Sequence, residues 1–105
     1  MRTFRMLLAA CVAAAAPLYA HAQSPDALYV KSLAATCANC HGTDGRTTDG
    51  SAVPALAGMP RDYMLLQLKS FRDGSRPATV MHQITKGFSE AQLQQVAGYF
   101  AAQKK

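Results

Sequence analysis

The chain has 105 residues, with 11 lysines and arginines against 6 aspartates and glutamates, so its formal net charge is +5. That length allows at most one small domain. The charge is mild and contains no run of basic residues, so the composition does not predict a nucleic-acid-binding protein. The mild positive charge is better suited to steering an acidic partner surface toward the chain.

The first 22 residues have the pattern of an export signal. Two arginines precede an apolar run over residues 6–16, and residues 20–22 match the small-x-small rule for signal-peptidase cleavage. The run is too short to span a bilayer as a helix, which needs about 20 residues. We therefore predict a signal peptide over 1–22, a mature domain over 23–105 and a periplasmic location without stable membrane insertion.

Cys11 offers an alternative to simple cleavage. Leu8-Ala9-Ala10-Cys11 resembles a lipoprotein signal, in which Cys11 would carry the lipid and begin the mature chain. That cleavage would leave an apolar region much shorter than the usual length of about 7 to 15 residues. An ordinary apolar cysteine within the signal is therefore the preferred interpretation.

The small size of the mature chain suggests that a bound cofactor contributes to its core. A domain of about 80 residues buries only about 60% of its unfolded surface, so its core is marginal. Exported domains of this size usually add disulfides, a metal or a cofactor. The mature chain has only Cys37 and Cys40, and a disulfide between residues so close in sequence would not link distant parts of the fold. A large buried cofactor would supply the missing apolar volume.

The first helix is expected to run from Pro25 to the cysteines, with Ser24 as its N-cap. Its predicted apolar side comprises Leu28, Tyr29, Leu33 and Ala35. Residues 42–58 follow as a loop, because they are rich in glycine and polar turn residues and contain Pro54. Structureless loops of that length are usually functional, and one that wraps a ligand fits.

A second helix is predicted to begin near Pro60 and to end at Gly74. Its expected apolar side comprises Tyr63, Leu65, Leu66, Leu68 and Phe71. An extended connector leads to residues 81–86, which are expected to form a single helical turn closed by Gly87. The last helix has a capping box of Ser89 and Gln92. Its apolar positions at helical spacing are Leu93, Val96, Ala97 and Phe100. These elements predict an all-α domain with three main helices and long connectors.

The stretch Cys37-Ala38-Asn39-Cys40-His41 admits three kinds of chemistry. A structural zinc ion needs four converging ligands, and adjacent side chains such as Cys40 and His41 rarely converge on one small ion. A thiol–disulfide exchanger would be expected within a βαβ pattern, which this chain lacks. The third possibility is haem, because Cys-x-x-Cys-His is the signature of c-type attachment. Cys37 and Cys40 would then form two thioether bonds and His41 would ligate the iron. Export agrees with this, because covalent haem attachment occurs outside the bacterial cytoplasm.

The iron needs a sixth ligand or an open position. A methionine and a histidine together raise the reduction potential and suit electron transfer. Met81, on an irregular segment well after His41, is the predicted distal ligand, and Met59 and His82 are the alternatives. Met64 is predicted to fill the core. His82 is otherwise expected at the surface or beside a haem propionate.

Four segments, taken in order, resemble the small class I bacterial c-type cytochromes, and they cover nearly all of the mature chain. They are "CANCHG", "VPALAG", "YMLLQLKSFRDGSRPATVM" and "KGFSEAQLQQVAGYFA". The resemblance implies a class I cytochrome c fold in which the first and last helices cross near the haem edge. Tyr99 and Phe100 match the aromatic positions of that crossing. It also implies that the carbonyl of Pro54 accepts a hydrogen bond from the other ring nitrogen of His41.

Within this family, "GSRPATVMHQITKGFS" is similar to the haem subunits of flavocytochrome c sulfide dehydrogenases, in which a flavoprotein passes electrons to the haem. Such subunits are often dihaem, whereas this chain has one attachment motif. Arg72 and Arg76 are candidates for contacts with haem propionates, although exposed arginines at a helix end are the simpler interpretation.

The function that follows is one-electron transfer, without enzymatic activity, through one covalent haem c and its iron. The expected partners are redox proteins, such as a flavoprotein dehydrogenase or a terminal oxidase. One alternative is a haem subunit held permanently by a flavoprotein dehydrogenase. A less favoured alternative is a haem sensor or enzyme with an open sixth position, against which Met81 argues.

Overall fold

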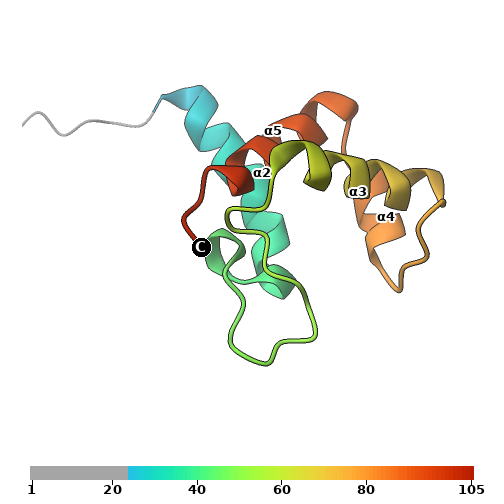
Figure 1. The fold of residues 1–105 in the computed structure, drawn as a ribbon. Coiled ribbons are helices and arrows are strands. Elements are labelled where there is room, and N and C mark those ends of the chain that lie inside the picture. Colours follow the sequence, from blue (N-terminus) through green and yellow to red (C-terminus); the bar gives the residue numbers. More distant parts are fainter. Residues whose placement is uncertain (1–23) are drawn as a thin grey trace, which may run out of the picture.

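The computed structural model describes residues 24–105, so the predicted signal peptide and Cys11 lie outside the described residues. This part of the chain is helical and contains no strand, which confirms the all-α prediction (Figure 1). Its elements are α2 (Pro25–His41), the 3₁₀ turn η1 (Thr43–Gly45), α3 (Arg61–Asp73), α4 (Met81–Lys86) and α5 (Glu90–Ala101). None of the helices within 24–105 has the length and apolar character needed to cross a membrane.

The helix ends follow the capping residues seen in the sequence. Ser24 accepts a hydrogen bond from the backbone N–H of Ala27 at 3.2 Å, which satisfies one of the free donors at the start of α2. Ser89 and Gln92 form the predicted capping box at the start of α5. Gly74 ends α3 in the left-handed conformation, with φ of 84°.

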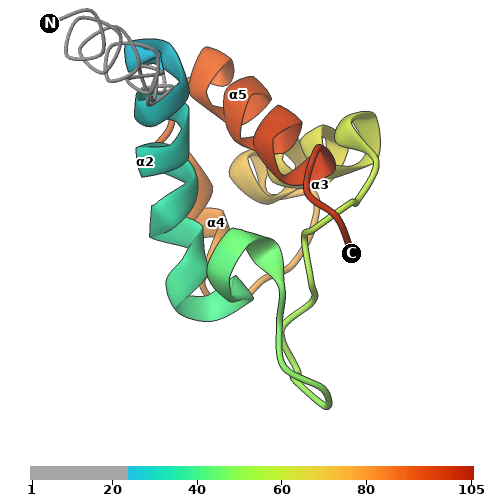
Figure 2. The ribbon, with the colours of Figure 1, turned by 90° about the vertical axis from the view of Figure 1, so that its left-hand side faces the viewer.

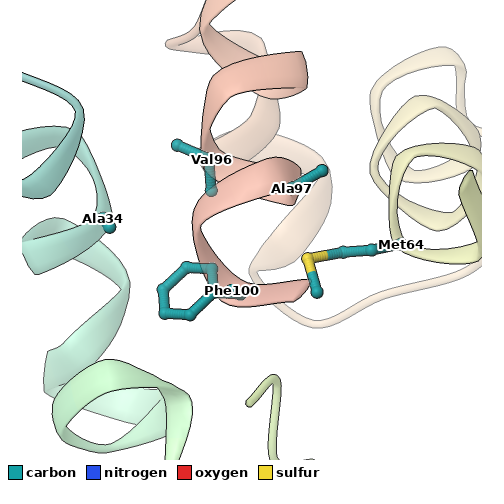
Figure 3. Close-up of a cluster of buried hydrophobic side chains, with 5 residues drawn as sticks. All are labelled: Ala34, Met64, Val96, Ala97 and Phe100. Carbon is teal, nitrogen blue, oxygen red and sulfur yellow. The ribbon is translucent and has the colours of Figure 1, made fainter. Parts of the chain in front are cut away.

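Helix α5 lies at the centre of the core. It packs against both α2 and α3, and Figure 2 shows that its axis is inclined to that of α2. The predicted apolar positions of α5 are all buried: Leu93, Val96, Ala97 and Phe100. Figure 3 shows Ala34 of α2 on one side of α5 and Met64 of α3 on the other. The burial of Met64 confirms its predicted role in the core.

The apolar sides predicted for α2 and α3 are partly wrong. Leu28, Tyr29 and Ala35 are exposed. The reason is that α2 meets the core only through its middle and last turns, at Leu33, Ala34 and Cys37. On α3, Leu65 and Leu68 pack against the core as predicted, whereas Tyr63 and Leu66 are exposed. The loop after α2 also holds the short turn η1, which was not predicted as an element.

A three-residue ion cluster joins α3 to α5. Glu90, the first residue of α5, lies 2.7 Å from the Lys69 ammonium and 2.6 Å from the Arg72 guanidinium. The hydrogen bond from Lys69, followed by that from Arg72, lowers the pKa of Glu90 from 4.5 to about 2. Arg72 is therefore engaged with a carboxylate of the protein itself.

This cluster predicts a pH dependence of stability. The folded-state pKa of Glu90 lies below its ordinary value, so the carboxylate stabilises the fold fully above pH 4.5 and loses this effect as the pH falls toward 2. Glu90→Gln should therefore be less stable than the wild type at pH 6, and the difference should vanish by about pH 2. Urea unfolding at several pH values measures this. A difference that stays constant across the range would contradict it.

Candidate functional site

The last turns of α2 carry the attachment motif. Cys37 and Cys40 are three residues apart in the helix, so their side chains project on the same side. Both cysteines are free thiols; Cys37 packs partly against the core, whereas Cys40 is exposed. Burial raises the pKa of the Cys37 thiol, which disfavours its thiolate form. His41 ends the helix and is only 8% exposed.

The His41 ring is oriented by the loop that follows it. Its Nδ1 lies 2.7 Å from the carbonyl oxygen of Pro54. A carbonyl oxygen only accepts hydrogen bonds, so Nδ1 must carry the proton and donate it. In the neutral ring, Nε2 is then left with a free lone pair, which is the form that binds a metal. A hydrogen bond of this kind also makes the imidazole a stronger ligand.

The backbone of residues 42–58 doubles back so that Pro54 reaches His41. Gly42 turns the chain with φ of 80°, and a Cβ at this position would lie 1.9 Å from the carbonyl oxygen of Arg46. Only glycine fits such a close approach. The carbonyl of Gly45 then accepts hydrogen bonds from the backbone N–H groups of Leu56 and Ala57, at 2.8 and 3.1 Å. These bonds join the segment before Pro54 to the segment after it.

Met81 comes from a different part of the fold. It is the first residue of α4, which packs against α3, and its side chain is half-buried. In Figure 1, α4 and the C-terminal turns of α2 both lie below the level of α5. Two apolar neighbours of Met81 are left uncovered by the protein, Val80 at 52% exposure and Ile84 at 40%. The apolar face of a flat cofactor would cover such side chains.

The alternative ligands have different surroundings. Met59 packs against the core cluster, on the segment just before α3. His82 is half-buried on α4, and its Nδ1 is covered by protein without a hydrogen-bond partner. Of the two arginines considered for propionate contacts, Arg72 is bound to Glu90. Arg76 stacks over the ring of Phe71, with its guanidinium carbon 4.6 Å from the ring centroid.

The donor set fits a haem better than a bare metal ion. Two thiols and one oriented imidazole stand on a single helix end, and a thioether stands on another helix. Among residues 24–105, no three His, Cys, Asp or Glu side chains gather where they could hold a metal ion. The core is also small, since three of its seven buried apolar residues are alanines. A large apolar cofactor would complete it.

Two side-chain contacts in the structure were not predicted from the sequence. Tyr99, expected only at the helix crossing, donates a hydrogen bond to the carboxylate of Asp44 in η1, and this bond raises the pKa of the Tyr99 phenol. Thr85 is almost completely buried in α4 and bonds to the backbone of Met81. Thr85 lies four residues after Met81, about one helical turn, so a contact between the two is consistent with a short helix here. The burial of Thr85, in contrast, depends on how α4 packs in the fold.

Comparisons with known proteins agree with this geometry. The chain is 38% identical to the cytochrome subunit of sulfide dehydrogenase from Chlorobaculum tepidum, over 65% of this chain and 60% of that protein. It is also 38% identical to cytochrome c4 of Pseudomonas aeruginosa, over 81% of this chain and 41% of that protein. A solved cytochrome c4 structure from Acidithiobacillus ferrooxidans superimposes with a TM-score of 0.66 and 31% identity, covering 76% of this chain and 51% of the other.

The chain therefore spans less than two thirds of the length of these relatives. Its fold is that of class I cytochromes c, as the resemblance implied. The family description that matches it is "Cytochrome c", over residues 27–103. Domains of this family contain covalently bound haem c with its iron, and Cys37, Cys40 and His41 fit the attachment motif. The chain belongs to the cytochrome c family.

Proposed function

We propose that this chain, after removal of residues 1–22, is a periplasmic carrier of single electrons with one covalent haem c. Cys37 and Cys40 would hold the haem through thioether bonds, and His41 and Met81 would ligate its iron. The observation that carries the proposal is the 2.7 Å contact between His41 Nδ1 and the Pro54 carbonyl oxygen. It leaves Nε2 free to bind metal beside two free thiols.

The haem supplies an iron that alternates between the ferric and ferrous states. The protein supplies two ligands that remain in place, so little has to move during electron transfer. The Pro54 carbonyl holds the His41 ring in one tautomer and one orientation. Val80 and Ile84 would keep water away from the Met81 side, which favours the less charged ferrous form.

Electrons would enter and leave near the two cysteines. Cys40 is exposed at the end of α2, so a haem attached there would have an edge close to the surface. Weak and small interfaces suit such encounters, because the partners must separate after each transfer. The proposed partners are redox proteins, with a flavoprotein dehydrogenase as donor and a terminal oxidase as acceptor among the candidates. In this role the chain itself is not an enzyme.

Visible spectroscopy of the wild-type protein tests the proposal. The protein would be expressed together with haem-maturation machinery, and spectra recorded in the oxidised state, the reduced state and the reduced state with carbon monoxide. A low-spin spectrum with the weak far-red methionine–iron band, unaffected by carbon monoxide, is expected. A high-spin spectrum that shifts with carbon monoxide would instead indicate an open-site sensor or enzyme.

A second candidate is a haem subunit held permanently by a flavoprotein dehydrogenase. The similarity to the sulfide dehydrogenase cytochrome subunit of Chlorobaculum tepidum favours it. This candidate predicts that the native protein elutes with a flavoprotein during gel filtration of a periplasmic extract. Elution at the mass of the single chain, with haem absorption and no flavin, would favour the free carrier.

A further inference from the structure

Thr85 is the one polar side chain of α4 that the fold buries almost completely, at 1% exposure. Its hydroxyl donates a hydrogen bond to the carbonyl oxygen of Met81 at 2.8 Å. The carbonyl oxygen of His82 is a more distant second acceptor at 3.4 Å. A buried hydroxyl must be paired, so these backbone carbonyls hold Thr85 in a single rotamer.

The helix that carries Met81 needs such support. Helix α4 has only six residues, and a helix of that length is not stable in isolation. Its N-cap residue, Val80, provides no side-chain hydrogen bond. Met81 is the first residue of α4, where fraying begins. The contact from Thr85 ties this first turn to a residue that is itself buried, on a helix that packs against α3.

We propose that Thr85 is a positioning residue, which keeps Met81 in place as the distal ligand of the iron. The inference rests on the proposed function, because it requires that Met81 is that ligand. Loss of the hydroxyl would loosen the first turn of α4 and increase the fraction of molecules in which Met81 has left the iron. A net loss of one such hydrogen bond corresponds to a change of roughly two- to tenfold in that fraction.

Imidazole binding to the ferric holoprotein measures this fraction. Imidazole takes the sixth position only when Met81 is detached, so its apparent affinity follows the detached population. We expect Thr85→Val to bind imidazole about two- to tenfold more tightly than the wild type. Thr85→Ser, which keeps the hydroxyl, should stay within about twofold of the wild type.

Tyr99→Phe is the matched control, because it removes one hydroxyl and one hydrogen bond on α5, outside α4. It should lower the guanidinium midpoint of unfolding while leaving imidazole affinity unchanged. If Thr85→Val leaves imidazole affinity unchanged, or if Tyr99→Phe raises it equally, the positioning role is overturned and the proposed function is untouched. A wild type with haem but no far-red methionine band would overturn the Met81 assignment and this inference together.

Discussion

Met81→Ala should abolish the far-red methionine–iron band and produce a ferrous protein that binds carbon monoxide. The alanine has no donor atom, so the sixth position of the iron becomes open to water and to added ligands. The reduction potential should also fall, because a thioether ligand favours the ferrous state. Visible spectra and a redox titration of the purified variant measure both effects.

Met59→Ala and His82→Ala are the controls for this prediction, since these residues are the alternative ligands. Met59 packs against the core cluster, so Met59→Ala should cost stability and preserve the band. His82→Ala should leave the band intact as well. If either control loses the band while Met81→Ala keeps it, the distal ligand is the residue altered in that control.

Phe100→Ala should destabilise the folded chain by about 3 to 5 kcal/mol. The Phe100 side chain is only 1% exposed and projects from α5 toward the side where Ala34 of α2 lies (Figure 3), so its removal leaves a cavity in a small core. Small domains have a total stability of about 5 to 15 kcal/mol, so this loss is a large part of the whole. Denaturant unfolding followed by far-ultraviolet circular dichroism measures the change.

Phe100→Ala should also disturb the loop that holds the Pro54 carbonyl against the His41 ring. A Cβ on Gly45 would lie 2.9 Å from a ring carbon of Phe100, and the Phe100 carbonyl accepts a hydrogen bond from the N–H of Gly58 at 2.9 Å. Phe100 thus supports the loop that brings Pro54 to His41. Phe100→Leu, which fills more of the cavity, should cost less than Phe100→Ala and preserve the spectrum. Equal stability of the two variants would show that the cavity is not the cause.

Local sequence signals determined the elements of this protein. The caps at Ser24 and Ser89 and the glycine at 74 act within one turn of the chain, so they can be recognised without knowledge of the fold. The apolar spacing of α5 was also sufficient, because this helix contacts partners along its length. The attachment motif is likewise local, which is why the type of cofactor followed from five adjacent residues.

Contacts between distant segments were decided by the tertiary structure. The apolar residues of α2 and α3 outnumber those that the core can cover, so spacing by itself did not predict that Leu28, Tyr29, Tyr63 and Leu66 are exposed. The engagement of Arg72 with Glu90 depends on how α3 packs against α5.

The candidate site likewise combines features that local sequence predicts with contacts that only the tertiary structure determines. The motif identifies His41, and the family resemblance implied a partner for its ring, but the distance from Nδ1 to the Pro54 carbonyl depends on the turn at Gly42 and on the bonds of Gly45. The support of Met81 by Thr85 depends on the burial of α4 against α3. Sequence determines which groups are present and which local turns they form. Packing decides which of those groups meet, because that depends on the competition of all helices for one small core.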